Sequence, residues 1–169
     1  EGLGQSRNIT AIKAYYLAGE QKPIIDLAQR MGVEFLDPNQ DYQWPLALGG
    51  ADVKLTSMVG AFGVFANTGV KHPVNSILKV ENSDGEILEE WKESSGEEVL
   101  DPQVAYLINS ILSDKEVRLG ENLTIPGHNN GAKTGTSNRK TKSGKYLPHD
   151  LLCIGYTPSL VTGVWAGNN

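Results

Sequence analysis

The chain has 169 residues, with 20 Asp and Glu against 15 Lys and Arg, a formal net charge of −5 and 39% hydrophobic residues. This composition is typical of one globular domain, or part of one, and it is too aliphatic for a disordered chain. The acidic balance disfavours nucleic-acid binding, which normally needs a basic surface, and no apolar run approaches the ~20 residues that span a bilayer.

Two helices are predicted near the start of the chain. Helical spacing of apolar residues predicts the first over residues 9–18, with Asn8 in the N-cap position and Gly19 at its end. Its apolar stripe would consist of Ile9, Ile12, Ala14, Tyr16 and Leu17. A shorter helix is predicted over residues 23–31, where Gly32 stops it.

The middle of the chain predicts a third helix and then a hairpin. The helix, over residues 54–66, has apolar residues at i, i+3, i+4 and i+7, namely Leu55, Met58, Val59, Phe62, Phe65 and Ala66. Gly60 and Gly63 lie inside it, each costing about 1 kcal/mol relative to alanine, so we expect a closely apposed neighbour. Alternating residues at 76–82 and 86–91, around Ser-Asp-Gly, predict a β-hairpin.

An acidic segment precedes the fourth predicted helix. Nine of the 20 acidic residues fall between Glu81 and Asp101, which we interpret as a solvated face. Asp101 and Pro102 predict the N-cap and first residue of a helix that extends to about Leu112. This helix would be buried through Val104, Leu107, Ile108 and Ile111.

Three strands are predicted in the last part of the chain, over residues 131–136, 151–157 and 160–166. A Pro-Ser turn joins the last two as an antiparallel hairpin. Residues 137–149 contain four cations and are expected to form a loop, too long for a tight hairpin, that rims a cleft. Helices followed by antiparallel strands predict an α+β fold, with an antiparallel sheet of the C-terminal strands flanked by helices.

The sequence predicts neither a metal site nor a cofactor. Cys153, the one cysteine, lies in an apolar run and is expected to be a buried core thiol. A single cysteine excludes an internal disulfide and a cysteine-cluster metal site. His72, His128 and His149 have no partners at the spacing that zinc sites use.

Lys133, Thr134, Gly135 and Thr136, at the end of a predicted strand, are the sharpest candidates for chemistry. Strand alternation puts the lysine and glycine on one face and the two threonines on the other, and the glycine lets a ligand approach the backbone. If the strand is an edge, the Thr136 N–H is free to stabilise an oxyanion. Lys133 adds a positive charge and the hydroxyls can bind a carboxylate. The alternative is a plain strand end with a solvated lysine.

Ser6 and Asn8 form a second candidate, because a hydroxyl and a carboxamide two residues apart can face the same way in an extended segment. The alternative is that Asn8 is only a helix cap. A further alternative is nucleotide binding, since residues 127–134 differ by one residue, Ala132, from a phosphate-binding loop. That loop requires a helix directly afterwards, which the sequence does not predict.

The order Ser6-x-Asn8, a helical stretch and Lys133-Thr134-Gly135 resembles the penicillin-recognising serine enzymes, which carry Ser-x-x-Lys, Ser-x-Asn and Lys-Thr-Gly. Further stretches resemble class A (bifunctional) penicillin-binding proteins: PLALGG at 45–50, FANTG at 65–69, ILKVEN at 77–82, GAKTGTS at 131–137 and GYTPSLVTGVWAGN at 155–168. We therefore expect residues 1–169 to form a single partial transpeptidase domain, similar in fold to penicillin-binding proteins and serine β-lactamases, that lacks the upstream Ser-x-x-Lys region.

This resemblance implies a role for each matching residue. Ser6 would relay a proton between the nucleophile and the leaving nitrogen, and the Asn8 amide would hold the substrate peptide. The Lys133 charge would support the relay and attract the substrate carboxylate. Thr134, Gly135 and Thr136 would bind substrate, with the Thr136 N–H as one of two oxyanion donors.

The nucleophile of the family is missing from the sequence. Ser76-x-x-Lys79 and Ser137-x-x-Lys140 fit the Ser-x-x-Lys pattern. The first lies in a predicted strand, where residues i and i+3 face opposite ways, and the second lies in the cationic loop. We therefore expect neither serine to be a nucleophile and the chain alone not to acylate.

The resemblance implies that the intact parent is a peptidoglycan D,D-transpeptidase, which cross-links stem peptides ending in D-Ala-D-Ala through an acyl-serine and which β-lactams acylate. It also implies a membrane-anchored parent with an upstream glycosyltransferase domain, acting on the extracytoplasmic face of the bacterial plasma membrane. A D,D-carboxypeptidase or β-lactamase of the same fold remains an alternative, as does a non-catalytic β-lactam sensor or wall-binding module.

Overall fold

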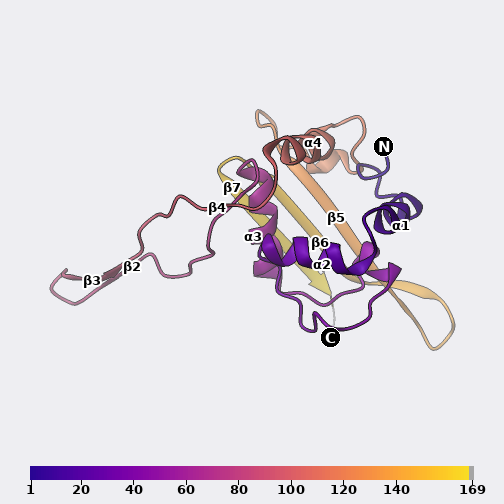
Figure 1. The fold of residues 1–169 in the computed structure, drawn as a ribbon, viewed down its shortest axis with the longest axis horizontal. Coiled ribbons are helices and arrows are strands. Elements are labelled where there is room, and N and C mark those ends of the chain that lie inside the picture. Colours follow the sequence, from indigo (N-terminus) through magenta and orange to yellow (C-terminus); the bar gives the residue numbers. More distant parts are fainter. Residues whose placement is uncertain (168–169) are drawn as a thin grey trace.

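The computed structural model describes residues 1–167, with helices in the first two thirds and a three-stranded antiparallel sheet at the end (Figure 1). The helices are α1 (Asn8–Leu17), α2 (Gln21–Arg30), η1 (Trp44–Leu48), α3 (Leu55–Ala66), α4 (Pro102–Ser113) and η2 (Glu121–Leu123). The strands are β1 (Val70–Lys71), β2 (Lys79–Glu81), β3 (Ile87–Glu90), β4 (Glu97–Glu98), β5 (Gly131–Lys140), β6 (Tyr146–Thr157) and β7 (Leu160–Gly167). The predicted α+β fold is confirmed. Within residues 1–167, none of the helices has the length and apolar character that crossing a bilayer requires.

The main sheet has the order β5-β6-β7, and both connections are antiparallel. Because β6 is the central strand, β5 lies at one edge of this sheet. Its backbone groups on the outer side are therefore not used by a neighbouring strand of the sheet.

The prediction of a loop over residues 137–149 is wrong. Strand β5 continues to Lys140 and β6 begins at Tyr146, so that only a short turn joins them. The turn is closed by the Thr141 N–H, which donates to Lys145 O at 2.7 Å, and by Gly144 at a φ of +83°. This part of the hairpin extends beyond the helices and is exposed on both faces, so the sequence has no apolar alternation to signal it (Figure 1).

Helix α3 packs against β6 and β7 and supplies the core. Val64 and Ile154 are the most deeply buried large side chains, and a core cluster joins Met31, Val33, Ala61, Val64 and Val99. The helix comes very close to the sheet at Gly163, where an added Cβ would overlap the Val59 side chain. Glycine at this position therefore permits the packing of α3 on β7.

The two helical glycines differ in their surroundings. A Cβ on Gly60 would lie 2.9 Å from Val74 Cγ2, which confirms a closely apposed neighbour. A Cβ on Gly63 would lie 4.0 Å from Val161 Cγ2, an ordinary van der Waals distance. The expected tight contact at Gly63 is therefore wrong.

The predicted buried faces of α1 and α4 are also wrong. In α1 the buried side chain is Tyr15, whereas Leu17 of the expected stripe is 88% exposed. In α4 the buried residues are Ala105 and Leu112, while Val104 and Leu107 of the expected set are exposed. Both helices carry apolar residues around most of their circumference, so periodicity alone could not select the packed face.

An arm leaves the body between β1 and β4, which pair with each other, and ends in the antiparallel β2–β3 hairpin (Figure 1). This confirms the hairpin predicted around Ser-Asp-Gly. All nine acidic residues from Glu81 to Asp101 are exposed, as expected of a solvated face. The cap of α4 is confirmed as well, because Asp101 Oδ1 accepts a hydrogen bond from the Gln103 N–H at 2.7 Å.

Candidate active site

A groove of about 490 Å³ separates β5 from the N-terminal end of α1 and from η1. All six site residues indicated by the sequence line it: Ser6, Asn8, Lys133, Thr134, Gly135 and Thr136. The remaining walls come from the turn at Gly2 and Leu3, from the first turns of α1, and from Ala47 and Leu48 of η1. The fold thus brings the two candidate motifs, which lie near opposite ends of the sequence, to one surface hollow.

Lys133 connects the two sides of this groove. Its Nζ donates to Ser6 Oγ at 2.7 Å and to the backbone carbonyl of Thr134 at 2.7 Å. The lysine is half-buried, and loss of hydration lowers its pKa below the ordinary value of 10.5. The ammonium is therefore held in place and deprotonates more readily than a solvated lysine.

The backbone at Ser6 is in the left-handed region, with a φ of +53°. Two consecutive turns precede it, in which the Ser6 N–H donates to Leu3 O at 3.1 Å and the Arg7 N–H donates to Gly2 O at 2.9 Å. A non-glycine residue in this conformation is strained, and such strain is concentrated at functional sites. This turn places the Ser6 hydroxyl within hydrogen-bond distance of Lys133 Nζ.

Asn8 is the first residue of α1, and the N-cap is Arg7, which makes no side-chain capping bond. The expectation that Asn8 only caps the helix is therefore wrong. Arg7 takes the extended conformation of an N-cap, and its carbonyl accepts from Thr10 Oγ1 at 2.6 Å. The Asn8 side chain is exposed at the groove, two residues from Ser6.

Lys133 to Thr136 lie within β5 at the open edge of the sheet. The chain remains a strand through Lys140, whereas a phosphate-binding loop would require a helix after Lys133. The nucleotide-binding alternative is therefore wrong. A plain strand end with a solvated lysine is also wrong, because Lys133 is half-buried and bonded to Ser6.

The two serines in Ser-x-x-Lys patterns lie outside the groove. Ser76 is exposed on the arm. Ser137 lies on β5, where its hydroxyl donates to Asp150 Oδ2 at 2.5 Å and accepts from the Asp150 N–H at 3.0 Å. The Ser137 hydroxyl thus donates its proton to a carboxylate and not to an activating lysine.

Cys153, expected in the core, is only partly buried.

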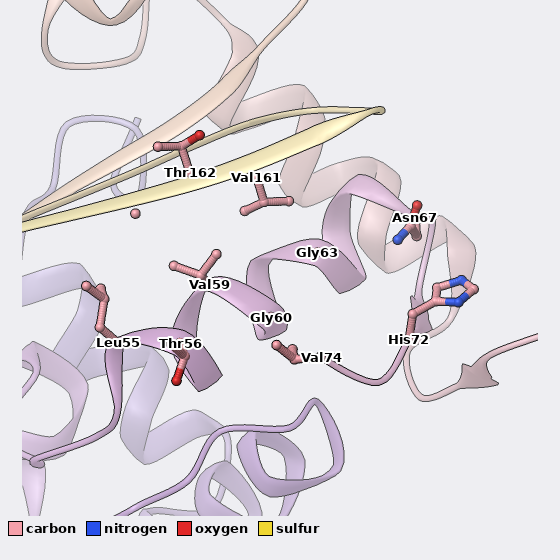
Figure 2. A pocket seen from close by; sticks show the side chains of 11 residues that line it. Leu55, Thr56, Val59, Gly60, Gly63, Asn67, His72, Val74, Val161 and Thr162 are labelled. Atoms are coloured by element: carbon pink, nitrogen blue, oxygen red, sulfur yellow. The ribbon is translucent and has the colours of Figure 1, made fainter. Parts of the chain in front are cut away.

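A second hollow of similar volume, about 480 Å³, lies between α3 and β7. Figure 2 shows Val59 of α3 and Val161 of β7 pointing toward each other across it, with Asn67 and His72 at its far end. Its lining is largely aliphatic and contains neither lysine nor arginine, so the groove beside β5 is the better candidate for chemistry. Among residues 1–167 there is also no cluster of three or more side chains suited to a metal ion.

Sequence analysis missed a buried guanidinium near the start of β5. Arg118 donates to Leu112 O at 3.1 Å, to Asn130 O at 3.0 Å and to Thr124 Oγ1 at 2.9 Å. It therefore ties the end of α4 to the residue that precedes β5. A charged residue in a polar loop gives no local signal of burial, and two of its three partners are backbone carbonyls, which every residue type carries.

The comparisons of this chain with known proteins agree on one protein family. Residues 20–166 match the penicillin binding protein transpeptidase domain family. Penicillin-binding protein 1A/1B of Bacillus subtilis is 28% identical over 98% of this chain and 19% of its own length. Penicillin-binding protein 1A of Mycolicibacterium smegmatis is 35% identical over 72% of this chain and 15% of its own length. The chain thus spans about a fifth or less of the length of these two curated relatives.

Solved structures agree in fold. Penicillin-binding protein 1A from Haemophilus influenzae superposes with a TM-score of 0.78, at 24% identity, over 99% of this chain and 29% of that one. The PonA1 protein from Mycobacterium tuberculosis, solved in complex with penicillin V, gives a TM-score of 0.72 at 25% identity, over 89% of this chain and 42% of that one. The matched family range includes Lys133 to Thr136, whereas Ser6 and Asn8 precede it, so their place in the site rests on geometry.

Proposed function

The chain belongs to the penicillin-binding protein transpeptidase domain family, and from this premise we propose that its intact parent is a peptidoglycan D,D-transpeptidase. The observation that carries the proposal is the contact of 2.7 Å between Ser6 Oγ and Lys133 Nζ. It lies in a groove that Asn8, Thr134 and Thr136 also line. A hydroxyl, a cation and an amide at one hollow are groups that can bind a peptide with a free carboxylate and assist its cleavage by a nucleophile supplied from elsewhere in the parent.

The first step is acylation. The nucleophilic serine, with its partner lysine, is supplied by a region of the parent other than these 169 residues. It attacks the carbonyl carbon of the penultimate peptide bond of a stem ending in D-Ala-D-Ala. The C–N bond breaks, the released D-Ala takes up a proton at its amine, and an acyl-serine remains. An amine of a neighbouring stem then attacks the ester and releases the serine.

The direction of the Lys133 to Ser6 hydrogen bond supports a relay role for Ser6. The ammonium has no acceptor, so it donates to Ser6 Oγ, and the proton of the Ser6 hydroxyl remains available to the leaving nitrogen. Ser6 can accept the proton of the nucleophile as it passes its own proton on. The lowered pKa of Lys133 assists this exchange, because the charge on its Nζ can vary at lower energetic cost than in a solvated lysine.

The backbone of β5 supports Thr136 as an oxyanion donor. The Thr134 carbonyl accepts from Lys133 Nζ, so this carbonyl is accessible from the groove. In a strand, the N–H and C=O of one residue point to the same side, and this direction repeats every second residue. The Thr136 N–H thus shares the side of the Thr134 carbonyl and faces the groove. Lys133, Thr134 and Thr136 all line the groove, which supports a role for them in binding the substrate carboxylate.

A labelled-penicillin assay on the intact parent tests the proposal. We expect a covalent adduct on the upstream serine, and no label on a parent that carries this serine would refute the function. The chain of 169 residues alone is expected to take no label. Product analysis with and without an acceptor amine then separates the transpeptidase from the alternatives. A cross-linked product supports transpeptidation, hydrolysed stem alone indicates a carboxypeptidase or β-lactamase, and an adduct without turnover indicates a sensor.

The same proposal gives the partners and the location of the parent. Its substrates are peptidoglycan stem peptides, and β-lactams compete for the same serine. The parent is membrane-anchored, carries a glycosyltransferase domain upstream and acts on the extracytoplasmic face of the bacterial plasma membrane. These properties are supported by the similarity to penicillin-binding proteins 1A and 1A/1B, of which the chain matches only a part.

A further inference from the structure

We propose that Asp150 is a positioning residue for this site: its carboxylate holds Ser137 and thereby fixes the direction in which the adjoining Thr136 N–H points. The inference rests on the proposed function, because it assigns Thr136 as an oxyanion donor. Asp150 itself lies on the central strand β6 and is absent from the lining of the groove. It acts through the residue that follows Thr136.

The pairing of β5 and β6 is irregular at this point. Thr136 pairs with Leu151, whereas Asn138 pairs with Pro148. One residue of β5, Ser137, therefore faces two residues of β6, His149 and Asp150, which is the arrangement of a β-bulge. A bulge interrupts the ladder, increases the local twist and turns the neighbouring residues in a new direction. Its geometry is decided by the contacts made within it.

Asp150 makes those contacts. Ser137 Oγ donates to Asp150 Oδ2 at 2.5 Å, and the Asp150 N–H donates back to Ser137 Oγ at 3.0 Å. The two bonds close a ring between the strands, so Ser137 can shift only if both are broken. Such reciprocal bonding replaces the ladder hydrogen bonds that the bulge removes.

The other groups around the carboxylate reinforce this arrangement. His149 Nδ1 lies 3.0 Å from Asp150 Oδ2, and Arg139 Nη1 lies 3.4 Å from the other ring nitrogen of His149. On β7, Gly167 pairs with Asp150, and a Cβ there would lie 3.0 Å from Asp150 Oδ1. Hydrogen bonds from Ser137 and His149 lower the pKa of the Asp150 carboxyl. The carboxylate therefore remains ionised and a strong acceptor at neutral pH.

Removal of either partner releases the bulge. Without the Ser137 to Asp150 bonds, the two strands are free to redistribute the extra residue of β6, which changes the direction of backbone groups beside it. Thr136 is the immediate neighbour of Ser137 and would be affected first. Displacement of a catalytic group by about 1 Å can slow a reaction by about 100-fold. We expect a decrease of about tenfold, because the N–H is displaced and not deleted.

The test measures acylation of the intact parent by a fluorescent penicillin, as a rate constant and as the fraction of protein labelled at completion. We expect Ser137→Ala and Asp150→Ala each to lower the rate constant by about tenfold while the labelled fraction at completion remains that of the wild type. Ser137→Thr keeps the hydroxyl and should restore most of the rate. Ser143→Ala, the same substitution on the hairpin turn, is the matched control and should react at the wild-type rate.

The outcomes separate the inference from the proposed function. A wild-type parent that takes no label contradicts the proposed function, and the inference about Asp150 is then contradicted as well. A labelled wild type with Ser137→Ala and Asp150→Ala reacting at its rate overturns the inference alone. A reduced labelled fraction at an unchanged rate shows that Asp150 only supports folding, which also overturns it. So does a Ser137→Thr variant that is as slow as Ser137→Ala.

Discussion

Lys133 Nζ lies 2.7 Å from Ser6 Oγ, although 127 positions separate the two residues in the sequence. This contact joins the strained turn before α1 to the edge strand of the sheet. The contact holds the Ser6 hydroxyl, which is otherwise exposed, whereas Lys133 is also held by its bond to the Thr134 carbonyl. The integrity of the groove therefore depends on the position of the turn before α1 relative to β5 as much as on the identity of the two residues.

The first prediction concerns the Ser6 hydroxyl. Ser6→Ala in the intact parent should lower the rate of acylation by labelled penicillin by about 100-fold or more, because a positioned proton-transfer group contributes about 10²–10⁴. Ser76→Ala, the same change on the arm, should react normally. A Ser6→Ala variant as fast as the wild type would exclude the relay, and a slow Ser76→Ala variant would instead implicate the serine of the arm.

The second prediction concerns pH. Burial lowers the pKa of Lys133 below 10.5, so its positive charge is present at neutral pH and is lost as the pH rises through that lowered value. The acylation rate of the intact parent should therefore fall on the alkaline side before pH 10.5 is reached. Lys133→Arg should remove this decline, because a guanidinium stays protonated, whereas Lys142→Arg on the hairpin turn should keep it. An identical decline in Lys133→Arg would assign it to another group.

The third prediction concerns the packing beneath the site. A Cβ on Gly131 would overlap the ring of Tyr156, whose hydroxyl donates to Asn109 Oδ1 at 2.7 Å. Gly131→Ala should therefore lower the free energy of unfolding by about 1–3 kcal/mol, as overpacking does. Gly155→Ala is the control, because the nearest atom to its Cβ is 3.9 Å away. Urea denaturation measures the unfolding midpoints of the two variants. Equal midpoints would contradict the prediction, because they would show that the Tyr156 ring shifts without cost to make room for the added methyl group.

The fourth prediction concerns Arg118. Its guanidinium reaches the carbonyls of Leu112 and Asn130 and the hydroxyl of Thr124 at once, which the single ammonium of a lysine cannot reproduce. Arg118→Lys should lower the free energy of unfolding by about 1–3 kcal/mol, because buried acceptors lose their donors. Arg139→Lys on the exposed hairpin is the control. Thermal unfolding at the same temperature for both variants would contradict the structural role of Arg118.

Features with a local cause could be predicted from the sequence. The helix that contains Gly60 is specified by its own apolar spacing, the start of α4 by the Asp101 carboxylate, and the β2–β3 hairpin by its turn residues. The Ser-x-Asn and Lys-Thr-Gly-Thr segments were identified by motif, and the structure brings them to one groove. Their catalytic roles remain predictions.

Features that depend on distant partners could not be predicted. The extension of β5 past Thr136 is held by pairing with β6, which is anchored by the buried Ile154 and not by any signal in its own polar residues. The contact of Ser137 with Asp150 requires a bulge, and a bulge shifts the register by one residue without changing the residue pattern. The packed faces of α1 and α4 were missed for the same reason, since neighbours in space select them.

The arm that carries β2 and β3 leaves the body after His72 and returns at Glu97, through one short ladder. In Figure 1 it extends away from the side of the molecule that holds α1 and β5. Its tip, between Ser83 and Gly85, is thus a suitable place to graft a fluorescent reporter or an affinity sequence. A cargo inserted there would be displayed far from the groove and would leave the geometry of Ser6 and Lys133 untouched.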